Sequence, residues 1–279
     1  MAGRICVVTG ATRGIGRATV QGLARLGATV VLVARRMEDG NKVSREIAAR
    51  VPVPPEVVTA DLSDLGSIRR AAEELAERYP HIHVLINNAG VIPRQRELTR
   101  DGLERQFAVN HLAYFLLTNL LLPQLQAGAP SRIINVSSGA HAHATIDFDD
   151  LQAQRRYDPK QVYSRTKLAN ILFTYELSRR LRGTGVTANC LNPGVVDTGM
   201  LADYMGVART KDAVSRTFGA TPEEGAETSI FLATSPELET VSGKYFESKR
   251  EVRSSRQSYD EATARRLWEV SERLTGLSS

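Results

Sequence analysis

Tyr163 and Lys167 open a long apolar-patterned segment, and their side chains could do proton chemistry together. Residues four apart on a helix lie on the same face, one turn from each other. An ammonium group beside a phenol favours the phenolate, so it lowers the pKa of the phenol from its ordinary value of about 10. Such a phenol can give a proton to a reacting oxygen or take one from it. The plainer interpretation is a core tyrosine beside a solvated lysine.

A glycine-rich turn, "TGATRGIG" at residues 9–16, lies between an apolar strand-like run and a helical pattern. Gly10 allows a tight turn, Gly14 lets the backbone approach a pyrophosphate, and Gly16 lets the helix pack close to a sheet. The free N–H groups at the helix N-terminus then offer partial positive charge to phosphates. Glycines alone also suit an ordinary turn, but this placement predicts a dinucleotide site. The G-x-x-x-G-x-G spacing differs from the G-x-G-x-x-G of other dinucleotide folds.

Short β-branched runs alternate with helical patterns along the chain. Seven runs have strand character, at residues 4–10, 29–35, 56–63, 83–90, 132–138, 186–196 and 243–247. This alternation predicts βαβ units and a parallel sheet covered on both faces. Thr221 and Glu224, with Pro222 between them, have the spacing of a capping box at a helix start. We expect one doubly wound α/β domain over residues 1–279, with a parallel seven-stranded sheet and a C-terminal helix at about 258–275.

The composition is that of an ordinary globular protein, with 42% apolar and 24% charged residues. The net charge of +5 is spread over helix-like segments that interleave arginine with glutamate, a pattern typical of solvated faces with mixed ion pairs, so we expect no nucleic-acid binding. The glycine turn begins too early for a signal peptide, and the longest apolar run, residues 111–125, is shorter than the ~20 residues of a membrane span. Cys6 and Cys190 lie in apolar runs and are expected to be buried thiols. These features predict a cytoplasmic protein without a transmembrane segment.

Five motifs occur in an order that resembles the short-chain dehydrogenase/reductase family. They are "TGATRGIG", "NNAG" at 87–90, "NVSS" at 135–138, "YSRTK" at 163–167 and "NPGVV" at 192–196. The resemblance covers essentially the whole chain and implies a Rossmann fold. "SSGAHA" at 137–142 and the segment 150–187 are similar to the retinol-dehydrogenase-like branch. The chain differs from that branch at Asn192, where histidine is usual, and in showing no membrane anchor.

The resemblance gives the opening pair a role in catalysis. It implies that Tyr163 passes a proton to or from the substrate oxygen while a nicotinamide carries the hydride. Lys167 would also hold the nicotinamide ribose, Ser138 would hydrogen-bond the substrate oxygen, and Asn110 would hold a water of the proton relay. Each residue alone could be structural, but the four together inside the family's motifs predict a catalytic set.

The choice of cofactor follows from charge at the end of the second predicted strand. NAD-preferring relatives carry an acidic residue there that binds the ribose diol. This chain has Arg35 and Arg36 instead, and Arg13 lies inside the glycine turn. Guanidinium groups suit a 2′-phosphate, so these residues predict NADP(H). The alternative is that they are ordinary surface charges.

Further contacts are implied by the resemblance. Asp61 would contact the adenine, residues 88–90 would line the adenosine side, and Val196 and Thr198 would meet the nicotinamide amide. The segment 199–220 mixes Met, Tyr and Phe with several charges and is expected to form a substrate lid. The full set expected to contact the cofactor is Gly10, Arg13, Gly14, Ile15, Gly16, Arg35, Asp61, Leu62, Asn88, Ala89, Gly90, Tyr163, Lys167, Val196 and Thr198.

Two pairs of histidines, His81 with His83 and His141 with His143, have one residue between their members. A structural metal would want further ligands nearby, and no cluster of cysteines or carboxylates accompanies either pair, so we expect no metal. We interpret these histidines as ordinary polar residues. The second pair follows Ser138 closely and would border the substrate pocket.

We therefore predict an NADP(H)-dependent oxidoreductase that interconverts a small-molecule alcohol and its aldehyde or ketone, with a lipophilic substrate. The alternative enzyme is a biosynthetic ketoreductase for a polar or cyclic metabolite. An idle NADPH-binding sensor would lack the tyrosine or the lysine, and both are present. An epimerase or dehydratase of the extended branch would have a T-G-x-x-G-x-x-G turn and a larger C-terminal domain. The physiological substrate and the direction of the reaction stay open.

The assembly has two alternatives. Residues 111–125 and 168–177 are apolar on more than one face, which is more than burial against a sheet requires. Many members of the family dimerise through the helices that carry Asn110 and the Tyr-Lys pair, and on this basis we favour a homodimer. The amphipathic segment 262–274 of the chain's own tail could instead cover the same surface.

Overall fold

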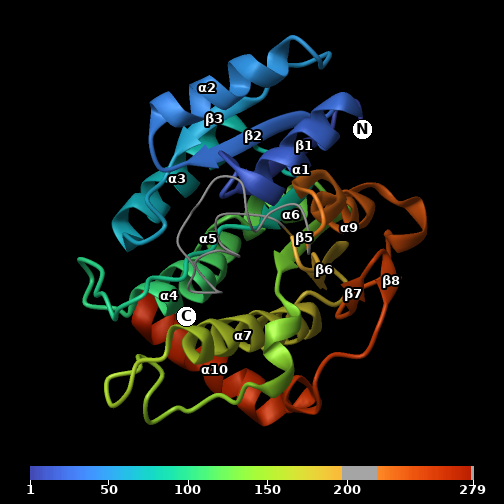
Figure 1. The fold of residues 1–279 in the computed structure, drawn as a ribbon. Coiled ribbons are helices and arrows are strands. Elements are labelled where there is room, and N and C mark those ends of the chain that lie inside the picture. The colour runs from blue at the N-terminus through green and yellow to red at the C-terminus, as the bar shows by residue number, and fades with distance from the viewer. Residues whose placement is uncertain (197–218, 278–279) are drawn as a thin grey trace.

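A sheet of eight strands forms the centre of the computed structural model, which describes residues 1–196 and 219–277 (Figure 1). Its strand order is β3-β2-β1-β4-β5-β6-β7-β8. The strands are β1 (Ile5–Thr9), β2 (Thr29–Ala34), β3 (Glu56–Thr59), β4 (Val84–Asn87), β5 (Ser131–Val136), β6 (Val186–Asn192), β7 (Tyr245–Glu247) and β8 (Arg250–Glu251). All seven predicted strands are present and parallel, which confirms the doubly wound α/β fold. The structure adds the antiparallel β8, whose two residues are too few to show a periodic pattern.

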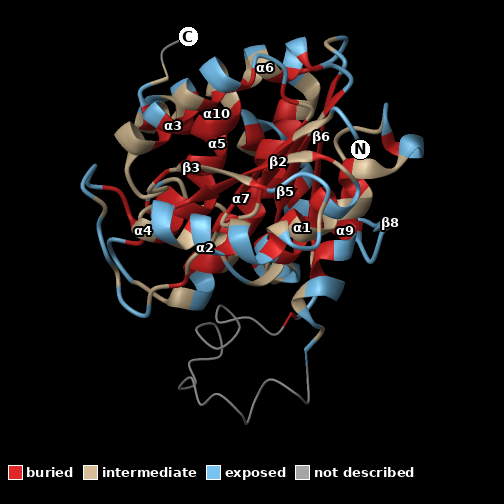
Figure 2. Ribbon diagram, turned by 90° about the horizontal axis from the view of Figure 1, so that it is seen from above, coloured by how far each residue is buried: buried red, intermediate tan, exposed pale blue. Residues whose placement is uncertain are grey.

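Helices cover both faces of the sheet, as Figure 2 shows from above. One face carries α1 (Gly14–Arg25), α2 (Met37–Ala48) and α9 (Pro222–Thr234). The other carries α3 (Leu65–Arg78), α5 (Ala113–Leu120) and α7 (Pro159–Arg180), with α10 (Glu261–Thr275) packed outside them. The shorter elements are α4 (Arg105–Phe107), η1 (Ala108–Leu112), α6 (Leu122–Ala127), η2 (Gly139–His143), η3 (Pro236–Leu238) and η4 (Arg256–Tyr259).

The strands are apolar runs because both faces of the sheet are buried. Successive residues of β1 point to opposite sides: Cys6 and Val8 belong to the core under α1, α2 and α9, whereas Val7 belongs to the core under α3, α5 and α7. Cys190, in β6, is fully buried as well, so both cysteines are buried thiols as predicted.

The apolar run 111–125 is divided among three elements. It begins in η1, a π-helical turn, continues through α5, and ends in α6, which has Pro123 in its first turn. Proline has no N–H for a helical bond and clashes with the preceding turn, so α5 ends at Leu120. Over residues 1–196 and 219–277, no helix combines the length and the apolar character needed to cross a membrane.

Two predicted helix starts can be checked against their caps. The capping box is confirmed, because Glu224 N donates to Thr221 Oγ1 (3.2 Å) and Thr221 N donates to Glu224 Oε2 (2.7 Å). The C-terminal helix begins later than the expected residue 258, at Glu261, because Asp260 caps it through the N–H groups of the first turn. Of the expected lid at 199–220, all but the last two residues lie outside the described ranges.

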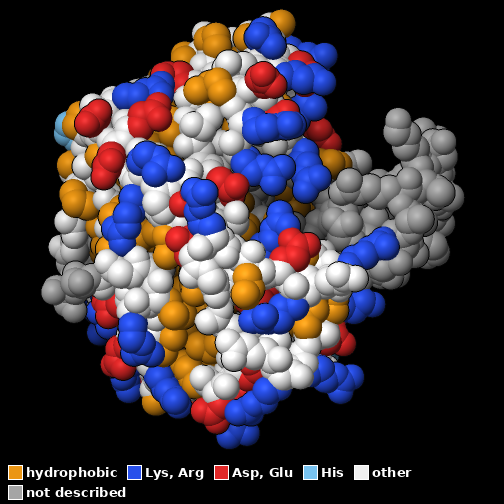
Figure 3. Space-filling model, turned by 90° about the vertical axis from the view of Figure 1, so that its left-hand side faces the viewer, with side chains coloured by type: hydrophobic (Ala, Val, Ile, Leu, Met, Phe, Trp, Pro, Cys, Tyr) orange, Lys and Arg blue, Asp and Glu red, His pale blue; other side chains and the backbone are white. Residues whose placement is uncertain are grey.

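Charged side chains of both signs are interspersed over the face drawn in Figure 3. Within α3, Arg78 pairs with Glu74 at 2.7 Å, and within α10, Arg265 pairs with Glu261 at 3.2 Å. Both pairs join residues four apart on one helix, so the predicted mixed ion pairs on the helical faces are confirmed.

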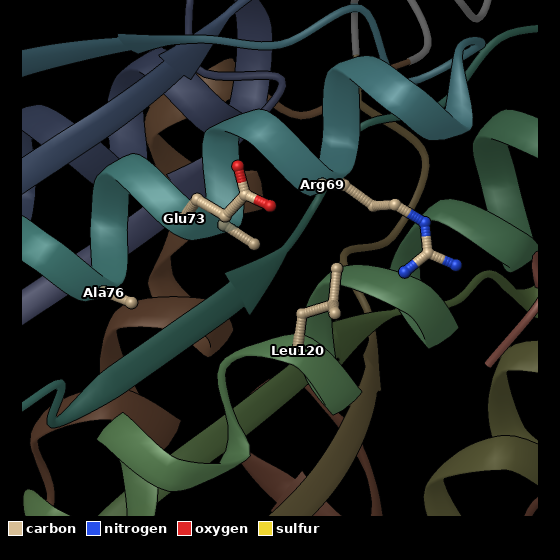
Figure 4. A pocket seen from close by; sticks show the side chains of 5 residues that line it. Arg69, Glu73, Ala76 and Leu120 are labelled. Atoms are coloured by element: carbon tan, nitrogen blue, oxygen red, sulfur yellow. The ribbon is translucent and has the colours of Figure 1, made fainter. Parts of the chain in front are cut away.

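The apolar surface of α5 and α7 is covered by α10, which runs beside α7 in Figure 1. Trp268 packs against Phe115 of α5 and Phe173 of α7, with ring centroids 4.9 and 5.7 Å apart. Arg69 of α3 donates to the carbonyl of Thr275 at the end of α10 (2.7 Å), and it borders a hollow of about 150 Å³ between α3 and α5 (Figure 4). The structure thus favours the alternative in which the chain's own tail covers these helices.

Candidate active site

The glycine turn and the segment 87–90 form one packed unit at the carboxyl ends of β1 and β4. Gly10 has φ +64°, and a Cβ there would lie 2.6 Å from Ala89 Cα. A Cβ at Gly16 would lie 2.4 Å from Asn88 Nδ2, which donates to Thr9 O (2.9 Å). Thr9 Oγ1 accepts from the backbone N–H groups of Asn88 (2.9 Å) and Ala89 (3.2 Å). Two of the three glycines are therefore required by the close approach of the two predicted motifs.

The helices that follow β1 and β2 lack side-chain caps. Arg13 and Arg36 occupy their N-cap positions, and no side chain of the described residues caps α1 or α2. By contrast, α3, α7, α9 and α10 are capped by Asp64, Asp158, Thr221 and Asp260. The first N–H groups of α1 and α2 thus keep their hydrogen-bonding capacity for another acceptor, and the residues present fit an anionic group such as a nucleotide phosphate.

The three arginines whose charge predicted a 2′-phosphate are all exposed, but they are not equivalent. Arg36 donates from Nε (2.8 Å) and Nη2 (3.1 Å) to the two carboxylate oxygens of Asp39. This hydrogen bond also holds the pKa of Asp39 below its usual range. The guanidinium group of Arg36 is therefore already paired with Asp39, so Arg13 and Arg35 are the arginines better suited to bind a phosphate.

Asp61 and Leu62 follow β3. Asp61 Oδ1 accepts from the backbone N–H of Ser63 (2.9 Å) and from its hydroxyl (2.6 Å), so the carboxylate also shapes its own turn. Leu62 packs against the core under α3. The sequence pattern does not show this local role of Asp61.

Val196 and Ile15 come together at α9. A Cβ at Gly225 would lie 2.5 Å from Val196 Cγ2 and 3.2 Å from Ile15 Cγ1. The glycine turn and the chain that leaves β6 therefore lie side by side, as the expected contacts with one cofactor require. Thr198 is outside the described residues.

Lys167 is buried beside Tyr163, so the alternative of a solvated lysine is wrong. Lys167 Nζ donates to Val136 O (3.0 Å) and lies 5.4 Å from the centroid of the Tyr163 ring and 5.9 Å from that of Tyr114. Ser137 Oγ donates to the carbonyl of Lys167 (2.8 Å). Burial lowers the pKa of Lys167 to about 7. The lysine is thus a desolvated group between β5 and the phenol.

Asn110, in η1, is linked to Tyr163 through α7. Its Oδ1 accepts from Val91 N (2.8 Å), and its Nδ2 donates to Val91 O (3.0 Å) and to Thr166 Oγ1 (3.2 Å). Thr166 Oγ1 in turn donates to the carbonyl of Tyr163 (2.7 Å). The Asn110 amide therefore fixes the loop after β4 against the helix turn that carries the phenol.

Ser138 follows β5 and opens η2. Its Oγ accepts from Ala140 N (3.2 Å), and the side chain is half-buried at the carboxyl edge of the sheet. His141 is buried beneath it and contacts its carbonyl, whereas His143 is exposed. In the other pair, His81 and His83, the second histidine has a structural role. His83 Nδ1 accepts from Ile5 N (3.0 Å) and joins the start of β4 to β1.

Three polar residues of this region are absent from the sequence prediction. Thr9 holds residues 88 and 89, Thr166 joins Asn110 to Tyr163, and Tyr114 donates its buried hydroxyl to Ala89 O (2.8 Å). Two signals could have found them. Thr166 lies inside "YSRTK", and Tyr114 follows Asn110 at the same four-residue spacing as the Tyr-Lys pair.

Comparison with known proteins agrees with this geometry. The family model described as short chain dehydrogenase matches residues 4–206. Retinol dehydrogenase 14 of Homo sapiens is 45% identical over 294 residues, which cover 99% of this chain and 88% of that protein. An uncharacterized protein from Mycobacterium paratuberculosis is similar in structure, with a TM-score of 0.81 at 35% identity, over 99% of this chain and 94% of that one. The NADP active-site complex of RhlG from Pseudomonas aeruginosa has a TM-score of 0.71 at 28% identity, over 88% of this chain and 95% of that one.

Both resemblances stated from the motifs are therefore confirmed, the family and its retinol-dehydrogenase-like branch. The matched family and the relative's activity make the protein an oxidoreductase acting between alcohols and carbonyl compounds. The glycine turn and the buried Tyr-Lys pair lie within two of the motifs on which the resemblance was based. This chain belongs to the short-chain dehydrogenase family.

Proposed function

We propose that the protein interconverts a lipophilic alcohol and its aldehyde or ketone with NADP(H), and that Tyr163 is the proton donor and acceptor. The observation that carries this proposal is the buried Nζ of Lys167, 5.4 Å from the centroid of the Tyr163 ring and bonded to Val136 O. When Lys167 is protonated, a cation this close favours the phenolate, which lets the phenol release and recover a proton. When bound, the nicotinamide supplies or accepts the hydride.

Ser138 orients the substrate in this proposal. Its Oγ already accepts one hydrogen bond, from Ala140 N, which leaves the hydroxyl proton to point at a substrate oxygen. Asn110 acts on the phenol through Thr166, because this link sets the position of the helix turn that bears Tyr163. In this proposal Tyr163 transfers the proton, Lys167 supplies charge, Ser138 orients the substrate, and Asn110 positions the helix turn that bears Tyr163.

NADP(H) is the proposed cofactor because the nucleotide end of the site has cations and open helix N-termini. The first N–H groups of α1 would bind the pyrophosphate, and Arg13 and Arg35 the 2′-phosphate. Residues 88–90 and Val196 would hold the adenosine and nicotinamide ends. The NADP complex of RhlG, at 28% identity, supports the same choice.

The lipophilic substrate class is proposed from the similarity to retinol dehydrogenase 14. One observation favours the alternative, a polar or cyclic carbonyl metabolite. Asn192 replaces the histidine usual in that branch, and its Nδ2 donates to Glu247 Oε1 (3.2 Å). Gly139 approaches the same amide, since a Cβ there would lie 3.3 Å from Asn192 Nδ2. A polar edge thus lies next to Ser138.

We also propose the reducing cytoplasm as the compartment and one domain as the folding unit. Cys6 and Cys190 are free and buried, and burial raises the pKa of the Cys6 thiol to about 12, which keeps it un-ionised and inert. Strands from β1 to β8 share one sheet, which supports a single unit.

The test is a screen of NADPH oxidation with retinal, medium-chain aldehydes, quinones and cyclic ketones, repeated with Tyr163→Phe. We expect the variant to lose turnover on every accepted substrate while NADPH binding, followed by nucleotide fluorescence, stays nearly intact. Tyr79→Phe removes a tyrosine hydroxyl on the C-terminal side of α3 that donates to Glu56 and is the matched control. Substantial carbonyl reduction by Tyr163→Phe would overturn the assignment.

A further inference from the structure

The two ring nitrogens of His141 have backbone partners that determine its protonation. Nδ1 lies 2.7 Å from the carbonyl oxygen of Ser138, which can only accept, so Nδ1 carries the proton. Nε2 lies 3.0 Å from the backbone N–H of Ser255, which can only donate, so Nε2 is bare. Burial lowers the pKa of His141 in agreement with this neutral form. The imidazole therefore donates a hydrogen bond to Ser138 and accepts one from Ser255, and so bridges two segments that are far apart in sequence.

The first end of this bridge holds the backbone of Ser138. The carbonyl of Ser138 accepts two hydrogen bonds from the same residue, one from His141 Nδ1 and one from His141 N (3.2 Å). The orientation of a carbonyl fixes the ψ angle of its residue, which is 154° here. Since Ser138 opens η2 from extended backbone, His141 determines how the serine leaves β5 and where its side chain points.

The second end holds the C-terminal segment, by which we mean residues 252–260. Ser254 Oγ lies 2.7 Å from the hydroxyl of Tyr175 on α7 and 2.6 Å from Ser258 Oγ. The rings of Tyr175 and Tyr259 stack with centroids 5.4 Å apart, and Ser254 N donates to Tyr259 OH (3.2 Å). The C-terminal segment is thus attached to the helix that carries Tyr163. The backbone N–H of Ser255, which donates to His141, is therefore held in place relative to that helix.

The ring of His141 is enclosed between these partners. It is buried and packs on Tyr245 of β7, with centroids 5.0 Å apart and an interplanar angle of 60°. A ring held by two hydrogen bonds and an aromatic neighbour cannot turn without losing both bonds. It provides a rigid support under Ser138.

We propose that His141 is a positioning residue for Ser138, which it couples to the C-terminal segment through its two ring nitrogens. The inference rests on the proposed role of Ser138 in orienting the substrate oxygen. His141 acts through the serine backbone, so its loss lowers the rate of the chemical step. The glycine turn and the two arginines at the nucleotide end belong to other elements, and cofactor affinity is therefore unchanged.

Substitution of His141 by the two amide side chains tests its two hydrogen bonds separately. His141→Asn places an amide near the position of Nδ1 and keeps a donor for Ser138 O, whereas His141→Gln reaches the position of Nε2 and keeps an acceptor for Ser255 N. We expect His141→Ala to lower kcat by roughly 10- to 100-fold, as for a misplaced catalytic group. His141→Asn should recover most of this loss and His141→Gln little of it, with NADPH affinity unchanged throughout. His81→Ala, at an exposed histidine far from Ser138 in the sequence, is the matched control.

Thermal unfolding accompanies these assays, because a histidine that only stabilises the fold would give a different pattern. In that case kcat of the folded protein would stay at the wild-type value in all three variants, or would fall equally in the Asn and Gln variants, and the inference would be overturned. Where His141→Ala does not fold, the comparison of the Asn and Gln variants decides alone.

The same assays separate this inference from the proposed function. An active wild type whose Ser138→Ala variant is equally active would refute the role of the serine itself. A slow Ser138→Ala variant beside a fully active His141→Ala variant would refute only the positioning role. If both roles hold, the double variant should be no slower than Ser138→Ala alone, because the two residues act as one unit.

Discussion

Ser137 Oγ donates a hydrogen bond of 2.8 Å to the carbonyl of Lys167, while Lys167 Nζ donates one of 3.0 Å to the carbonyl of Val136. The two bonds run in opposite senses between β5 and α7, so the end of the strand and the first turns of the helix are fixed to each other. They also distinguish two adjacent serines. Ser137 is turned into the core toward α7, and Ser138 is left at the edge of the sheet.

Ser138→Ala should reduce kcat by roughly 100-fold or more, the effect of removing one donor to a developing oxyanion. Steady-state kinetics with the best substrate of the screen would measure it, together with the thermal midpoint to confirm folding. Ser137→Ala is the matched control: it removes a buried hydroxyl whose acceptor is Lys167 O, so it should lower stability by about 1 kcal/mol with a smaller effect on rate. A rate unchanged in Ser138→Ala would move the role elsewhere.

Arg35→Asp should shift cofactor preference toward NADH, because a carboxylate repels the 2′-phosphate and can accept hydrogen bonds from a ribose diol. The quantity to measure is the ratio of kcat/KM with NADPH to that with NADH. Arg36→Asp makes the same charge change one residue further on, where the arginine is already paired with Asp39, and should alter the ratio less. A ratio that stays constant in Arg35→Asp and in an Arg13/Arg35 double variant would contradict the charge argument.

Lys167→Met should abolish turnover and yet raise the free energy of unfolding. Burial lowers the pKa of the folded-state lysine from 10.5 to about 7, so the ammonium group opposes folding. Below about pH 7 both states are protonated, and the desolvation of the ammonium group then costs the wild type about 5 kcal/mol, which Lys167→Met does not incur.

Between pH 7 and 10.5 the unfolded state binds one more proton than the folded state, so the stability of the wild type rises with pH. The difference in stability between Lys167→Met and the wild type therefore decreases over this range. Urea unfolding at pH 6 and pH 9, chosen on either side of the folded-state value, would measure it. A variant less stable than wild type at both pH values would show that the bond to Val136 O outweighs desolvation.

The purified protein should have the mass of one 30.6 kDa chain in light scattering at micromolar concentration, because α10 covers the face through which relatives are expected to dimerise. Trp268→Ala should lower the free energy of unfolding by roughly 3–5 kcal/mol, since it removes a buried indole between α5 and α7. Arg265→Ala, on the exposed side of the same helix, is the control. A mass of two chains that persists on dilution would restore the homodimer favoured from the sequence.

The sequence was sufficient for the seven parallel strands, because each carries its own β-branched or aromatic run between turn residues. It was also sufficient for the neighbourhood of Tyr163 and Lys167, because the helical spacing alone puts them on one face. The sequence did not predict β8, because a strand of two residues is too short to show an alternating pattern.

Polar contacts between distant segments were harder to predict. The bond from Tyr114 to Ala89, and the one from Ser255 to His141, depend on where the chain returns in space, and no local pattern records that. The charge of Arg36 contributed to the prediction of NADP(H), whereas its pairing with Asp39 depends on side-chain geometry at the start of α2 and could not be read from the sequence.

The covering of α5 and α7 by α10 has a consequence for biosynthesis. Phe115 and Phe173 are translated long before Trp268, so a nascent chain on the ribosome has these rings without their cover. Until α10 has emerged, the growing polypeptide presents an adhesive aromatic surface, the kind that chaperones shield in cells. Expression at lower temperature or with extra chaperone should therefore increase the yield of folded protein more for Trp268→Ala than for Arg265→Ala.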